Sequence, residues 1–128
     1  MEWRIEPVAG GRLIRVSTSG PFQIRQQRQM FEELGAHAAF SEGLSILFDN
    51  RQLDMASSDE SAIRESVDIV QEFMCKLRIE RLAGLVDKGL SFGVGRQFEI
   101  LTDLAGGHGF RLFKDEQLAL RWLRGEQL

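Results

Sequence analysis

The chain opens with apolar and polar residues in alternation, which is the pattern of a half-buried β-strand. Trp3, Ile5 and Val8 alternate with charged residues, and Gly10-Gly11 allows a tight reversal. The extended pattern then resumes at Leu13-Ile14-Arg15-Val16. We therefore expect a β-hairpin at the start of the chain.

Four later segments repeat apolar residues at the spacing of an amphipathic helix. The polar segment Ser17–Pro21 separates the hairpin from the first of them, which we expect to end near residues 37–40. Ser57 and Glu60 stand at capping-box spacing before the second, which is the longest. The expected buried stripes are Ile24, Phe31, Leu34 and Ala38; Ile63, Val67, Ile69, Val70, Phe73, Met74 and Leu77; Val94, Phe98, Leu101, Leu104 and Ala105; and Leu118, Ala119, Trp122 and Leu123.

Three short, nearly continuous apolar runs lie between these helices and predict strands that are covered on both faces. They are Leu44–Phe48, which stops at Asp49-Asn50, then Leu82–Asp87, and Phe110–Phe113. Strands that alternate with helices favour parallel pairing through right-handed crossovers. The expected fold is α/β in the order β-β-α-β-α-β-α-β-α, with a mixed, mostly parallel sheet of four or five strands and packed helices.

Length and composition fit one globular domain spanning residues 1–128. Apolar residues make up 43% of the chain and charged residues 27%, which argues against disorder. No apolar run approaches the roughly 20 residues of a membrane span, and the first residues lack the apolar core of a signal peptide. The single cysteine cannot form an internal disulfide, so we expect a reducing, cytoplasmic setting.

The distribution of charge argues against a nucleic-acid partner. Residues 1–28 carry five basic and two acidic side chains, whereas residues 29–68 carry two basic and nine acidic ones. The basic side chains are scattered and are not interleaved with aromatic residues, unlike a nucleic-acid-binding stripe. The acidic middle segment is typical of a solvated face.

Polar residues that follow the predicted parallel strands are the main candidates for a binding site, because ligands of open α/β sheets bind beyond the carboxyl ends of the strands. A glycine-rich loop over residues 89–96 leaves one strand and enters a helix, where free backbone N–H groups attract anions. It matches neither the dinucleotide-binding fingerprint nor the P-loop. The residues expected to bind a small anionic or lipid-like ligand are Asp49, Arg51, Lys88, Ser91, Gly93 and Arg96.

Ser57 and Ser58 precede the second helix and are candidates for phosphorylation, because a phosphate is stabilised at a helix N-terminus. Helix capping is the alternative role, and nearby acidic residues would repel a phosphate.

The residue types that most often carry catalysis or bind metals do not form a site in this sequence. His37 and His108 fall in helix-to-strand connections, at the sheet edge opposite the expected site. Cys75 lies on the second helix, where we expect a small buried or half-buried side chain. No segment has metal-ligand spacing, so we expect no metal and no cofactor.

The element order and several local sequences resemble the SpoIIAA-like proteins of the STAS/Sec14-like group. The resemblance rests on the strand ending Leu47-Phe48-Asp49 and on Gly95–Leu123, with its strand Arg111-Leu112-Phe113-Lys114-Asp115 and its helix Ala119-Leu120-Arg121-Trp122-Leu123. It implies a four- or five-stranded sheet with packed helices in a cytoplasmic protein that is commonly dimeric, with Trp3 or Trp122 as candidate dimer anchors if exposed.

The same resemblance implies two functional features. Sec14-type relatives suggest an apolar-ligand pocket between helices and sheet. Anti-sigma-factor antagonists of this fold are phosphorylated on a serine at the start of the second helix, in an Asp-Ser-Ser-Gly-like setting. Here Ser57-Ser58 is followed by Asp59 and no glycine, and lies eight or nine residues after Asp49.

The sequence therefore predicts a non-catalytic module that binds a small anionic or lipid-like ligand, or a protein partner, at the carboxyl edge of the sheet. A phosphorylation switch at Ser57 or Ser58 that regulates a protein partner is the alternative. An enzyme is the third reading, and no constellation of general base and nucleophile supports it.

Overall fold

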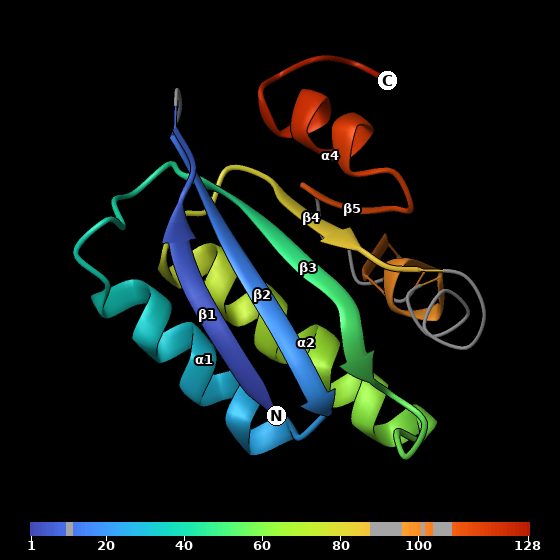
Figure 1. Ribbon diagram of the computed structural model, residues 1–128. Helices are drawn as coiled ribbons and strands as arrows, with labels where there is room; N and C mark the ends of the chain where they lie inside the picture. Colours follow the sequence, from blue (N-terminus) through green and yellow to red (C-terminus); the bar gives the residue numbers. More distant parts are fainter. Residues whose placement is uncertain (10–11, 88–95, 101, 104–108) are drawn as a thin grey trace.

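The computed structural model describes residues 1–9, 12–87, 96–100, 102–103 and 109–128, and shows a sheet with helices on both faces (Figure 1). The elements are β1 (Glu2–Pro7), β2 (Leu13–Pro21), α1 (Ile24–Ala36), β3 (Ser45–Asp54), α2 (Glu60–Lys76), β4 (Leu82–Leu85), β5 (Phe110–Phe113) and α4 (Glu116–Leu123). Residues 96–100 and 102–103 are also helical. None of the helices described is both long enough and apolar enough to span a membrane.

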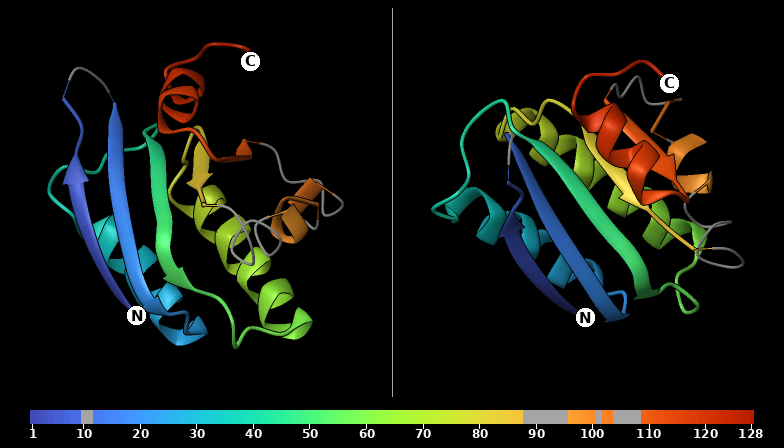
Figure 2. Two further views of the ribbon diagram at one scale, coloured as in Figure 1. Left: turned by 45° about the vertical axis from the view of Figure 1, so that its right-hand side comes forward. Right: turned by 45° about the horizontal axis from the view of Figure 1, so that its top comes forward.

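The five strands lie in the sheet in their sequence order, β1-β2-β3-β4-β5. β1 pairs with β2 in antiparallel fashion, and every later pair is parallel. When successive crossovers are right-handed and the strand order always advances in the same direction, the crossover helices lie on one face of the sheet. Accordingly, α1 and α2 lie side by side behind the sheet, while α4 lies on the front (Figures 1 and 2). The predicted α/β fold with a mostly parallel sheet is confirmed.

Alternation along the strands builds a separate apolar layer on each face of the sheet. The layer under α1 and α2 contains Phe31 and Phe73, whose rings stack with centroids 5.1 Å apart. Its strand residues are Ile14, Val16, Ile46, Phe48 and Leu82. The layer under α4 consists of Leu13, Leu47, Ala83, Leu85, Phe113, Ala119 and Leu123.

Side chains satisfy free backbone groups at both ends of α4. Asp115 caps its N-terminus by accepting hydrogen bonds from the backbone of residues 117 and 118. At the other end, Arg81 donates through Nη1 to the Trp122 carbonyl at 2.5 Å. The Arg81 guanidinium also lies 5.0 Å from the centroid of the Trp122 ring. This cation satisfies a carbonyl at the helix C-terminus, where positive charge is favourable.

Both tryptophans are half-buried against their own chain and are not exposed anchors. Trp3 donates through Nε1 to Glu33 Oε2 on α1 at 2.5 Å. The Trp122 ring packs against Phe113, with centroids 5.6 Å apart. The expected homodimer therefore stays a prediction, and these two residues no longer provide its anchors.

The sequence predicts that the third strand stops at Asp49-Asn50, and this is wrong. β2 and β3 stay paired as far as Pro21 and Asp54, with a register shift between Ser17 and Ser19. Over this shift β3 advances by one residue more than β2, as in a β-bulge. Asp49 to Gln52 are polar, so the apolar run from which the strand is predicted ends before the strand does. Residues 17–21 accordingly belong to β2 and do not end it.

The cap of α2 also differs from the prediction. The helix begins at Glu60, and its N-cap is Asp59, whose side chain accepts a hydrogen bond from the Ala62 N–H at 2.8 Å. Ser57 lies two residues before this cap. An ionised carboxylate makes a charge-assisted bond at the positive end of the helix, which explains why Asp59 takes the position.

Three residues expected to be buried on helices are exposed, and one of them, Ala38, lies beyond the end of α1 at Ala36. Leu118 retains 40% of its accessible surface, because Ala119 and Leu123 form the face of α4 that meets the sheet. Cys75 is exposed on α2, two residues after the buried Phe73 and so on the opposite side of the helix.

We expect Arg81→Met to lower the free energy of unfolding by about 1–3 kcal/mol, because it removes a charge-assisted hydrogen bond and a cation–π contact. Chemical denaturation measures this loss. Arg124→Met is the matched control, because the Arg124 side chain makes no such contact with the described residues. Equal losses in the two variants would contradict this role for Arg81.

Candidate functional site

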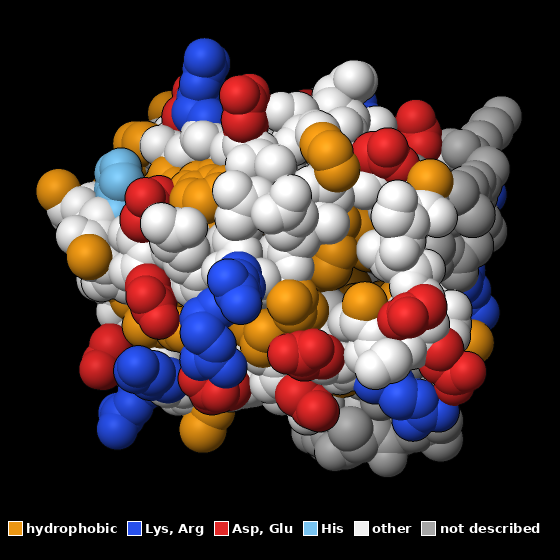
Figure 3. Space-filling view, turned by 90° about the horizontal axis from the view of Figure 1, so that it is seen from below, with side chains coloured by type: hydrophobic (Ala, Val, Ile, Leu, Met, Phe, Trp, Pro, Cys, Tyr) orange, Lys and Arg blue, Asp and Glu red, His pale blue; other side chains and the backbone are white. Residues whose placement is uncertain are grey.

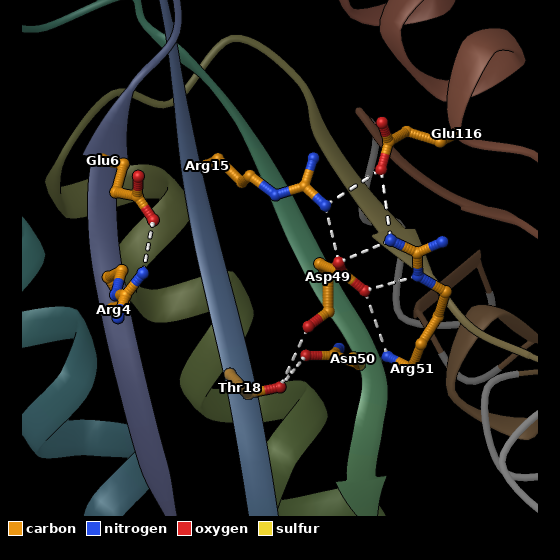
Figure 4. A network of polar contacts seen from close by, with 8 residues as sticks. All are labelled: Arg4, Glu6, Arg15, Thr18, Asp49, Asn50, Arg51 and Glu116. Carbon is orange, nitrogen blue, oxygen red and sulfur yellow. Dashed lines mark hydrogen bonds and ion pairs between the residues drawn. The ribbon is translucent and has the colours of Figure 1, made fainter.

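Two of the predicted site residues, Asp49 and Arg51, belong to a network of four charged side chains (Figure 4). Arg51 makes a two-pronged contact with Asp49, Nε to Oδ1 at 2.9 Å and Nη2 to Oδ2 at 2.8 Å. Arg15 Nη2 lies 2.6 Å from Asp49 Oδ2 and 2.9 Å from Glu116 Oε1. Arg51 Nη2 also reaches Glu116 Oε1, at 3.2 Å.

Strand alternation explains how three elements supply this network. Arg15 on β2 lies beside Leu47 in the parallel register, and Asp49 follows Leu47 by two residues. These positions share the face of the sheet that α4 covers. The first turn of α4 then brings Glu116 over the strands.

The pKa values in the network shift in the directions that favour the ionised forms. The hydrogen bond from Arg51 lowers the pKa of Asp49 against the opposing effect of burial, and Arg15 adds to the lowering. The Asp49 hydrogen bond likewise raises the pKa of Arg51. Burial alone would lower the pKa of Arg15, but its hydrogen bonds with Glu116 and Asp49 outweigh burial and raise it.

This network is a structural link between α4 and the sheet rather than a binding site. Two guanidinium groups face two carboxylates, so the charges balance. Each guanidinium is bonded to both carboxylates. Asp49 and Arg51 therefore connect α4 to the sheet and do not present an unpaired charge to an anion.

The other residues expected to bind an anion are not brought to this network. Lys88, Ser91 and Gly93 lie outside the described residues. Arg96 is exposed and pairs with Glu99 one helical turn away. The second carboxylate oxygen of Glu99 accepts a hydrogen bond from the Leu112 N–H of β5 at 2.8 Å. This pair joins the helical residues 96–100 to the last strand.

Ser57 and Ser58 lie in the turn before α2, and neither caps the helix. Ser57 is exposed and Ser58 is half-buried, and the Ser58 N–H donates to the Met55 carbonyl at 3.0 Å. Because Asp59 occupies the N-cap, a phosphate at this turn would stand next to a carboxylate. Phosphorylation here stays a prediction.

A cavity of about 100 Å³ lies between the helix layer and the sheet. It reaches residues that follow the carboxyl ends of β2, β3 and β4, which are Phe22, Met55 and Val86. Most of its lining is apolar and includes Met30, Phe31, Phe48, Leu53, Val70 and Phe98. Viewed from below, the end of the molecule to which β2 and β3 point shows apolar side chains among charged ones (Figure 3).

Four polar residues interrupt this apolar lining, one each from β2, α1, β3 and α2: Thr18, Gln27, Asn50 and Ser66. The Thr18 hydroxyl donates to Asn50 Oδ1 at 2.6 Å. Gln27 is 6% exposed, and its Oε1 atom is buried without a hydrogen-bond partner among the described residues. The neighbouring Gln26 has a similar oxygen but does not line the cavity. Buried polar atoms are rarely left unpaired, so the Gln27 oxygen in the lining calls for an explanation.

The sequence reasoning missed these cavity residues, although a signal was present. Gln27 lies three residues after Ile24 and four before Phe31, which places it within the apolar stripe of the first helix. Ser66 has the same relation to Ile63 and Val70 on the second. A polar residue at a core position of each of two neighbouring helices is the pattern that indicates a polar patch under them.

Among the residues that the structure describes, no group of three His, Cys, Asp or Glu side chains could hold a metal ion. His37 is half-buried at the C-cap of α1, where its Nδ1 accepts a hydrogen bond from the Ala39 N–H. His108 lies outside the described residues.

Comparison with known proteins identifies the fold and no activity. No family model matches the sequence, and no curated protein matches it. Five solved chains do match. One is an uncharacterised protein of the DUF3478 family with a SpoIIAA-like fold, from Shewanella loihica PV-4. It is 19% identical, the match covers 95% of this chain and 92% of that one, and the TM-score is 0.59. The predicted SpoIIAA-like resemblance is thus confirmed as a fold.

We expect Asp49→Asn to lower the free energy of unfolding by about 1–2 kcal/mol at neutral pH, because the network loses a carboxylate bonded to two guanidinium groups. Arg15 and Arg51 are partly exposed, so the expected loss in the free energy of unfolding is smaller than for a fully buried ion pair. The folded-state pKa of Asp49 is lowered, so its contribution is present above the unfolded value of about 4 and is lost as pH falls through the folded value.

Denaturation midpoints measured across pH test this expectation. The wild-type and Asp49→Asn curves should converge as the pH falls below about 4. Asp68→Asn, at an exposed α2 position without an ion pair to the described residues, is the control. A constant gap between the wild type and Asp49→Asn at every pH would refute the assignment.

Proposed function

We propose that this protein is a non-catalytic module that binds a small, largely apolar molecule in the cavity between α1, α2 and the sheet. The buried, unpaired Oε1 atom of Gln27, a residue of the mostly apolar lining, is the observation that carries the proposal. Binding sites for small molecules are commonly apolar pockets with a few polar groups that fix the orientation of the ligand.

The size of the cavity supports a compact ligand. An engineered cavity of roughly 150 Å³ in another protein, lined by apolar side chains, stays dry and binds benzene. The cavity here measures about 100 Å³, which suits a molecule of similar or smaller size, or one end of a longer chain. A ligand confined wholly to it is smaller than a fatty acid.

The chemistry of the lining supports binding without catalysis. The polar side chains among the described lining residues are hydroxyls and amides, with no carboxylate, imidazole, amine or thiol. A serine or threonine hydroxyl is a weak nucleophile unless a base activates it. The Thr18 hydroxyl, moreover, donates a hydrogen bond to an amide oxygen and not to a base.

The regulatory alternative, a phosphorylation switch at Ser57 or Ser58, has less support. Asp59 rather than a serine caps α2. Phosphopeptide mapping from cells that express the protein tests this alternative directly.

Methionine methyl NMR tests the proposed cavity with a control built into the chain. We expect apolar probes such as toluene to shift the methyl signals of Met30 and Met55, which line the cavity. Met74 packs against the core but does not line the cavity, so its signal should stay in place. Saturable shifts at the first two residues would support the proposal. Unmoved signals, or equal shifts at all three, would rule it out.

Partial filling of the cavity provides a second test. Gly84 lines it, and a Cβ atom added there would meet Phe110 and Leu112 side-chain atoms at 3.5–3.7 Å, which are ordinary contacts. We expect Gly84→Ala to weaken toluene binding several-fold because it occupies part of the space, while the protein remains folded. Calorimetric titration and thermal unfolding measure the two effects. Unchanged affinity in a folded variant would place the bound probe elsewhere.

A further inference from the structure

We propose that the ligand of this cavity is uncharged and carries a hydroxyl group that forms a hydrogen bond with the Gln27 side chain. This inference rests on the proposed function and specifies the ligand class. It follows from the charge of the lining, from the unpaired oxygen and from the chemistry of an amide.

The lining argues against an ionised ligand. None of the described side chains around the cavity carries a charge. Two of the predicted anion-binding residues, Asp49 and Arg51, face the other side of the sheet and are bonded to each other and to Arg15 and Glu116. An ion moved from water into such a space would lose its hydration without gaining a counter-charge from any of these side chains. This chemistry favours a neutral molecule over the anionic ligand that the sequence predicts.

The unpaired oxygen calls for a donor. Gln27 lies in the first turn of α1 with a buried side chain, and its Oε1 atom has no hydrogen-bond partner among the described residues. An unsatisfied buried acceptor is costly, and a ligand that donates to it removes that cost. A pure hydrocarbon would fill the space but leave the oxygen unpaired.

A hydroxyl satisfies the amide in either of its orientations. Half a turn about the terminal bond exchanges Oε1 and Nε2 of Gln27, which presents a donor in place of an acceptor. A hydroxyl can donate to the oxygen or accept from the nitrogen, whereas a carboxylate can only accept. The Thr18 hydroxyl already donates to Asn50 Oδ1, so it does not compete for the Gln27 oxygen.

Phenol, toluene and benzoate are matched probes because they share a ring and differ in the polar group. Affinities are measured by titration of the Met30 and Met55 methyl signals in the wild type and in Gln27→Leu. We expect Gln27→Leu to weaken phenol about fivefold relative to toluene, which is the effect of one net hydrogen bond. In the wild type, benzoate should bind at least tenfold more weakly than phenol.

Two further variants keep the test decisive. Gln29→Leu, at an exposed position of the same helix, should leave the phenol-to-toluene ratio unchanged. Gln27→Met keeps the length of the side chain and should reproduce the effect of Gln27→Leu if the leucine variant misfolds.

The outcomes separate this inference from the proposed function. An unchanged ratio in Gln27→Leu and Gln27→Met, or benzoate binding as tightly as phenol, would overturn the hydroxyl inference while toluene binding still supports the cavity. Failure of phenol and toluene alike to bind the wild type would overturn the proposed function itself.

Discussion

The structure depends on the pairing of β3 with parallel neighbours on both of its sides. Because side chains alternate along a strand, the tripeptide Asp49-Asn50-Arg51 serves both faces of the sheet at once. Asp49 and Arg51 belong to the network of charged side chains beneath α4, whereas Asn50 lines the cavity beneath α1 and α2. The extra residue of the bulge lies between Asp49 and Gln52, and Leu53 beyond it also lines the cavity, three residues after Asn50. A one-residue slip in this strand would exchange the two faces.

The two faces of the sheet therefore have different physical roles. On the α4 face, a balanced set of ion pairs and a close-packed apolar layer leave no unpaired charge in the network. On the other face, four polar residues and a space remain within a core that is otherwise closely packed. A core gives up packing energy wherever it keeps a void or an unpaired polar atom. The part of the core that gives up stability is thus the candidate binding site. A functional site is where the agreement between sequence and structure is expected to fail.

Much of the fold could be predicted from the sequence because it follows from periodicity, and the exceptions have identifiable physical causes. The hairpin, the parallel strands and the buried stripe of α2 all follow from regular patterns. The length of β3 could not be predicted, since the apolar run ends at Phe48 and the bulged part of the strand that follows is polar as far as Gln52. The cap of α2 was assigned to Ser57 from spacing alone, although Asp59 makes the stronger bond. For the site, the ends of the predicted strands indicated the edge of the sheet. They did not indicate Gln27, because it lies within the apolar stripe of a helix.

The carboxylate of Glu99 has a consequence for how copies of this chain can associate. β5 is the last strand of the sheet, and a bare last strand invites a strand from another molecule to add to it. The Leu112 N–H is already bonded to Glu99, so an incoming strand would first have to displace a charged group. At the opposite border, β1 ends in Pro7, which has no N–H to offer. Lateral growth of the sheet into a fibre is therefore opposed at both borders.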